Sequence, residues 1–139
     1  MPEVQLEGYD FAIRRHVKWG EMDAFQHVNN TVYFRWFEDV RIAHFEALGA
    51  MKAMAETGIG PILGATSARF RLPLEYPDEV IIGSRIRDVG EDRFLMEYAV
   101  QSSAKDALAA TGDGRVVFFD YNVGAKAAIP VAVRDAISG

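Results

Sequence analysis

Residues 19–48 read WGEMDAFQHVNNTVYFRWFEDVRIAHFEAL, and this stretch decides the fold of the chain. It begins at the end of a predicted strand, passes through a short polar loop, and becomes a long helix rich in aromatic residues. The loop, residues 20–30, holds side chains that can take part in chemistry: Asp23, His27, Asn29 and Asn30. No other part of the sequence places so many such residues so close together. We therefore look for the functional site here.

The helix is expected to begin at Asn29 or Asn30, because the side-chain oxygen of either can accept a backbone N–H of the first turn. Projected at 100° per residue, its apolar residues fall on one wide face. That face comprises Tyr33, Trp36, Phe37, Val40, Ala43, His44, Ala47 and Leu48. Gly49 is free to adopt a left-handed cap. A helix with so wide an apolar face predicts a sheet wrapped around it.

Strand patterns occupy most of the remaining chain. Alternating apolar and polar residues predict five strands, at residues 9–19, 62–72, 79–89, 93–101 and 107–121. Within the last strand, Gly112 and Gly114 suggest a bulge or bend. The order of one strand, one helix and four strands predicts an α+β fold in which one antiparallel five-stranded sheet wraps around one central helix. The length favours a single domain, residues 1–139.

Two further segments are short. Residues 50–60 are expected to form a short helix or an irregular link, and the segment after Asn122 a terminal helix or a frayed tail. Long strands leave open sheet edges, and pairing of identical edges across a two-fold axis predicts a homodimer.

Composition excludes several classes of function. The chain has no cysteine, which removes disulfides, thiolate metal sites and cysteine nucleophiles. A net charge of -5 argues against nucleic-acid binding, which depends on excess lysine and arginine. No apolar run reaches the ~18 residues of a membrane span, and residues 1–11 lack a signal peptide's hydrophobic segment. We therefore expect a cytoplasmic protein that binds neither nucleic acid nor membrane.

Residues 17–38, VKWGEMDAFQHVNNTVYFRWFE, resemble the 4-hydroxybenzoyl-CoA thioesterase family of the hotdog-fold superfamily. The predicted order of elements matches that fold over nearly the whole chain. The resemblance implies an acyl-CoA substrate, no cofactor, and active sites shared within a homodimer, with pairing into a homotetramer as the alternative. Two positions depart from the family pattern: Glu21 stands where Asp is common, and Gln26 where many members have Gly.

The resemblance also implies roles for individual residues. Asp23 would act on the thioester carbonyl, as a nucleophile or as the base for water, and a backbone N–H at or near Asn30 would polarise the carbonyl oxygen. From the residues alone, Asp23 fits equally an Asx turn that binds loop amides. His27 would orient the carbonyl, polarise water or brace the loop against Asn29, which shapes the loop.

Other residues are predicted to shape the pocket or to bind substrate. Phe25 and the helix aromatics set the pocket depth, and Tyr33 is either core or substrate wall. Arg69 and Arg71 share one strand face, and they would form a phosphate-binding patch with two later arginines, Arg85 and Arg87, if those strands pair. The alternative is ordinary strand charge paired with acidic neighbours.

Three alternatives to this hydrolase remain distinct. The acyl carrier is coenzyme A or an acyl-carrier protein, or the domain binds acyl-CoA without hydrolysing it. A metal site is not predicted, because the three histidines are scattered and a catalytic zinc usually needs three protein ligands. Serine-triad, ATP and NAD chemistry lack their sequence motifs.

Overall fold

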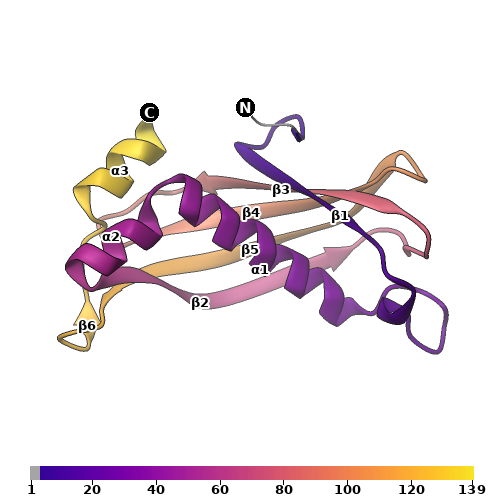
Figure 1. Ribbon diagram of the computed structural model, residues 1–139, viewed down its shortest axis with the longest axis horizontal. Coiled ribbons are helices and arrows are strands. Elements are labelled where there is room, and N and C mark those ends of the chain that lie inside the picture. The colour runs from indigo at the N-terminus through magenta and orange to yellow at the C-terminus, as the bar shows by residue number, and fades with distance from the viewer. Residues whose placement is uncertain (1–3) are drawn as a thin grey trace.

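The computed structural model describes residues 4–139 and contains one antiparallel sheet with a long helix lying across its face (Figure 1). The strands lie in the spatial order β1-β3-β4-β5-β2, and β6 pairs with the end of β5. The strands are β1 (Phe11–His16), β2 (Ile59–Phe70), β3 (Glu79–Arg87), β4 (Arg93–Ser102), β5 (Ala107–Asp120) and β6 (Ala125–Lys126). The helices are α1 (Asn30–Ala47), α2 (Ala50–Thr57) and α3 (Val131–Ser138), with a 3-10 turn, η1, at Trp19–Glu21.

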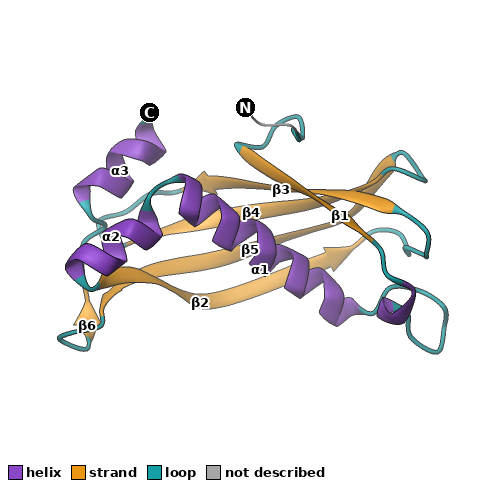
Figure 2. Cartoon of the chain, viewed as in Figure 1, coloured by secondary structure: helices purple, strands orange, loops and turns teal. Residues whose placement is uncertain are grey.

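The predicted α+β hotdog architecture is confirmed, with the five long strands close to their expected positions. The structure adds the two-residue strand β6. It also resolves two open points, because residues 50–57 form a helix and the terminal segment forms another (Figure 2). None of the helices within residues 4–139 is both long enough and apolar enough to cross a membrane.

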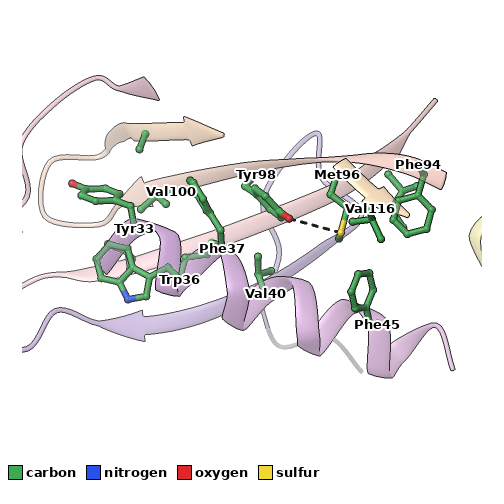
Figure 3. Close-up of a cluster of buried hydrophobic side chains, with 14 of the residues drawn as sticks. Tyr33, Trp36, Phe37, Val40, Phe45, Phe94, Met96, Tyr98, Val100 and Val116 are labelled. Atoms are coloured by element: carbon green, nitrogen blue, oxygen red, sulfur yellow. Dashed lines mark hydrogen bonds between the residues drawn. The ribbon is translucent and has the colours of Figure 1, made fainter. Parts of the chain in front are cut away.

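Helix α1 packs on the sheet through aromatic side chains (Figure 3). The ring of Phe37 stacks on that of Tyr98 with centroids 4.8 Å apart, and Phe45 meets Phe94 edge-on at 6.4 Å. Burying one such side chain contributes roughly 1.5–3 kcal/mol. The buried helix residues are Tyr33, Trp36, Phe37, Val40, Arg41, His44 and Phe45. The buried face is therefore rotated from the predicted one, since Arg41 and Phe45 are inside and Ala47 is exposed.

Gly112 and Gly114 make room for these rings, and the bulge or bend predicted there is wrong. Both glycines pair in unbroken register with β2 and β4. A β-carbon on Gly112 would lie 2.5 Å from the Phe37 ring, and one on Gly114 would lie 2.6 Å from the Tyr98 hydroxyl. The glycines therefore permit a close approach of helix and sheet.

The two ends of the sheet are β1 and β2, and β2 is the more exposed of the two. Its central residues, from Ile62 to Ser67, are all exposed in the single chain. Gly64 is an extra residue in this strand, because the pairing with β5 shifts between Leu63 and Ala65. The sheet therefore offers one long unpaired edge, as expected from the sequence.

Candidate active site

The loop before α1 is a short hairpin whose ends are tied together. Met22 and Val28 form an isolated antiparallel bridge. Within it, the Asp23 N–H donates to the His27 carbonyl and the Gln26 N–H to the Asp23 carbonyl, each at 2.9 Å. These bonds hold residues 23–27 in a compact turn beside the helix.

Gln26 occupies a left-handed backbone conformation, with φ of 63°. This is the position at which many members of the family have glycine, and glycine alone adopts that conformation without a steric cost. Gln26 and Phe25 are both exposed, and Phe25 is 82% exposed. Neither side chain lines the cavity described below, so the pocket role predicted for Phe25 is not supported within a single chain.

The two oxygens of the Asp23 carboxylate have different surroundings. Oδ1 accepts the Phe25 N–H at 2.9 Å, which is the Asx turn. Oδ2 accepts no hydrogen bond from any residue of the range 4–139. Asp23 therefore has a loop-bracing oxygen and a free one, and the two interpretations drawn from the sequence are compatible.

Helix α1 begins beside this carboxylate. Asn29 is the cap, and its side-chain oxygen accepts the N–H and the hydroxyl of Thr31 at 2.9 Å each. Asn30 is the first helical residue, so the capping role that the sequence left open for its side chain belongs to Asn29. The Asn30 N–H finds no acceptor within residues 4–139. A free N–H at the positive end of an 18-residue helix is a suitable donor to a negative oxygen.

A cavity of about 410 Å³ brings these groups together. Five of the eight predicted site residues line it: Asp23, His27, Asn30, Tyr33 and Arg71. The remaining wall is Val28 together with the segment that leaves β2, namely Phe70, Leu72 and Pro73. That segment lies about forty residues beyond the loop in the chain. The sequence carries no local signal that it would form the opposite wall.

Tyr33 combines a core and a cavity role. Its ring packs edge-on against Trp36 at 5.3 Å and Phe70 at 5.1 Å, and the side chain is 3% exposed. Burial, and secondarily the charge of Asp78, raises the pKa of Tyr33 to about 12. Its hydroxyl therefore remains protonated and neutral at physiological pH.

The predicted patch of four arginines is wrong. β2 pairs with β5, whereas β3 pairs with β1 and β4, so Arg69 and Arg71 are separated from Arg85 and Arg87. Arg85 bonds Glu97 at 2.7 Å, the acidic pairing given as the alternative. Arg69 is exposed and lines none of the cavity, and only Arg71 reaches it. No group of three acidic or histidine side chains suited to a metal ion occurs in residues 4–139.

Comparison with known proteins follows from this geometry. A model of the thioesterase-like superfamily matches residues 17–137. No curated protein matches the chain by sequence. Among solved structures, the PA2801 protein from Pseudomonas aeruginosa is similar at 25% identity, with a TM-score of 0.80 and coverage of 91% of this chain and 96% of that one.

Two similar structures are named as coenzyme A thioesterases. A gentisyl-coenzyme A thioesterase shares 24% identity with a TM-score of 0.78, covering 91% of this chain and 98% of its own. A 1,4-dihydroxy-2-naphthoyl-CoA thioesterase from Synechocystis shares 17% identity with a TM-score of 0.81, covering 92% and 95%. At these identities the two structures establish a common fold. Because the family model covers almost the whole chain, this protein belongs to the thioesterase-like superfamily of hotdog-fold proteins.

Proposed function

We propose that the protein is an acyl-CoA thioesterase, which hydrolyses a thioester to a carboxylic acid and free coenzyme A. One observation carries the proposal: the free carboxylate of Asp23 and the helix start at Asn30 line the same cavity. Thioester hydrolysis needs an attacking oxygen and a donor for the oxyanion that forms. Membership of the superfamily, and the thioesterases among the similar structures, support this choice of chemistry.

In the proposed reaction the thioester carbonyl lies between Asp23 and Asn30. Asp23 takes a proton from a water molecule while the water oxygen bonds to the carbonyl carbon, and the carbonyl electrons move to oxygen. The Asn30 N–H and the helix dipole stabilise that oxyanion, and one such donor contributes ~3 kcal/mol in acyl transfer. Collapse of the intermediate breaks the C–S bond and releases coenzyme A, whose thiolate regains a proton.

The nucleophilic variant uses the same atoms. Asp23 attacks the carbonyl carbon directly, coenzyme A leaves, and water hydrolyses the resulting mixed anhydride. Hydrolysis in water enriched with oxygen-18 distinguishes the routes in a single turnover. Label appears in the Asp23 side chain only if the anhydride forms and water then attacks its protein-side carbonyl. Label confined to the released acid leaves both routes open.

Supporting roles fall to the other cavity residues. His27 and Asn29 position the loop, with the His27 ring facing the cavity, and the neutral Tyr33 hydroxyl is a donor for a polar acyl substituent. Arg71 supplies positive charge for a phosphate of coenzyme A, and Arg69 reaches the same carrier from the exposed strand surface. The working assembly is a homodimer, in which the partner's strand edge pairs with β2, and two dimers form the alternative tetramer.

The test is a thiol-release assay over acyl-CoA substrates from short aliphatic to aromatic. Asp23→Asn keeps an oxygen for the Phe25 N–H but removes the charge, so it should fold normally and lose at least 100-fold in turnover. The matched control is Asp88→Asn, an exposed turn residue at the opposite end of the sheet, which should retain full turnover. Near-normal hydrolysis by Asp23→Asn would refute the proposed role of Asp23.

The same assay separates the two rival functions. An acyl-carrier-protein thioesterase would release thiol faster from acyl-carrier protein than from the matching acyl-CoA. A binding domain would bind acyl-CoA in calorimetry and release no thiol from any member of the panel.

A further inference from the structure

A second cavity, of about 580 Å³, lies beyond the Asp23 site along the same helix. It is enclosed by the C-terminal half of α1, by α2 and by the start of β2 (Figure 1). Its walls are mostly apolar, and Phe45, Met51, Met54 and Leu63 are among them. A cavity of this size and character is typical of small-molecule sites.

Arg41 is the one charged residue of that wall within residues 4–139. It is 9% exposed, and no carboxylate of those residues lies within 4.0 Å of it. The nearest acidic residue on the same helix face, Glu38, pairs instead with Arg35 at 3.8 Å. A buried cation without an anionic partner costs several kcal/mol, so the absence of a partner needs a reason.

The partner that Arg41 does have is neutral. Its Nη1 donates to the Tyr98 hydroxyl at 3.1 Å, and that hydroxyl in turn points to the sulfur of Met96 (Figure 3). Burial raises the pKa of Tyr98, so this hydroxyl is not an anion at physiological pH. The protein therefore supplies one hydrogen-bond acceptor to a guanidinium group that carries five N–H donors.

The remaining nitrogens of Arg41 face open space. Every completely enclosed side-chain nitrogen or oxygen in residues 4–139 has a hydrogen-bond partner, so the unpaired nitrogens of Arg41 are not completely enclosed. The space next to Arg41 is the apolar cavity and a smaller one of about 340 Å³ on its other side, near Phe34 and Thr66. The free donors of a buried cation thus open onto apolar walls.

We propose that this cavity is a binding site for an amphiphilic monocarboxylate, of the class of medium-chain fatty acids. The carboxylate pairs with the fork of Arg41, which matches its planar geometry, and the hydrocarbon chain lies against the apolar walls. This site uses none of the residues of the Asp23 cavity, so it stands or falls independently of the proposed hydrolysis.

The first experiment compares two ligands of equal chain length on the full-length protein. Isothermal titration calorimetry at pH 7 with decanoate and with decanol, both below their aggregation concentrations, separates charge recognition from apolar burial. Decanoate should bind at least tenfold more tightly than decanol. Equal affinities, or no binding of either ligand because another chain or segment fills the cavity, would overturn the proposal.

The second experiment assigns the preference to Arg41. Arg41→Met keeps the length and apolar contacts of the side chain, so decanoate should weaken at least tenfold to the level of decanol, whose binding should not change. Arg35→Met, an exposed arginine of the same helix, is the control and should keep the preference. A preference that survives in Arg41→Met would sink the assignment.

A third variant covers failure of Arg41→Met to fold. Leu63 is 38% exposed and lines the cavity, so Leu63→Trp should fill the space with little strain. It should weaken decanoate and decanol alike by at least tenfold. Unchanged affinity for both ligands would show that they bind elsewhere, whereas thiol release by the wild type would still report on the Asp23 site.

Discussion

At the Asp23 turn, structural and chemical demands fall on different atoms of one carboxylate. Oδ1 is used by the Phe25 N–H, and Oδ2 is left for another partner. Aspartate was identifiable from the sequence through the resemblance, but its dual use was not, because the turn depends on backbone geometry. Likewise two adjacent asparagines could each cap the helix, and only the backbone conformation assigns the cap to Asn29.

Gln26 carries a backbone cost that a single substitution can remove. A non-glycine residue at φ of 63° pays about 1–2 kcal/mol, while glycine pays part of this back through a more flexible unfolded chain. Gln26→Gly should therefore raise the free energy of unfolding by about 0.5–1 kcal/mol in urea titrations. Gln101→Gly, in the interior of β4, is the comparison and should lower it by a similar amount.

At the scale of elements, local periodicity predicted the helices and strands well, and contacts distant in sequence limited the rest. Helix α1 and the five long strands follow from apolar spacing alone. The pairing of β2 with β5 does not, because strand order depends on the whole chain, and the four-arginine patch failed for that reason. Arg41 was missed as well, since a charge at helical spacing normally predicts a solvent-facing position.

His44 joins α1 to β1 and β3 and makes this packing sensitive to pH. Its Nδ1 lies 2.7 Å from the Ser84 hydroxyl, and its ring stacks on Phe11 at 5.0 Å. Burial lowers the pKa of His44 to about 4, while nearby Asp10 opposes that shift. The unfolded chain, with an ordinary pKa near 6.5, therefore binds a proton that the folded state refuses.

The sign of the effect follows from those two pKa values. Stability contributed by neutral His44 is complete above pH 6.5 and is lost as the pH falls from 6.5 toward 4. Between pH 7.5 and 5.5 the free energy of unfolding should fall by about 1 kcal/mol from this residue. In urea titrations at both pH values, His44→Gln should lack this component. An unchanged pH dependence in that variant would mean that other groups cause it.

At the scale of the whole molecule, the exposed β2 edge is the feature that a single chain leaves unfinished. Six consecutive exposed residues, with backbone groups free along the edge, invite pairing with another strand. The two-fold arrangement proposed above would place the middle of β2, near Gly64 and Ala65, close to its own copy. This also brings the partner's residues toward the Asp23 cavity, whose wall includes Phe70 at the end of the same strand.

A charge at the middle of β2 should therefore separate the copies. Ala65→Lys places two like charges across the two-fold axis, so the dimer dissociation constant should rise at least tenfold in analytical ultracentrifugation. Ala55→Lys, on the exposed side of α2, adds the same charge elsewhere and should leave the dimer intact. A wild-type protein that sediments as a monomer would exclude the arrangement altogether.

The two glycines under α1 have a consequence for how the chain can change. Each occupies a place where the missing methyl group is filled by a ring, Phe37 over Gly112 and Tyr98 beside Gly114. Helix and sheet therefore share a single volume, and neither partner of a pair can grow unless the other shrinks. Divergence at these positions is a coordinated exchange, and the curvature of the sheet is inherited through what two residues lack.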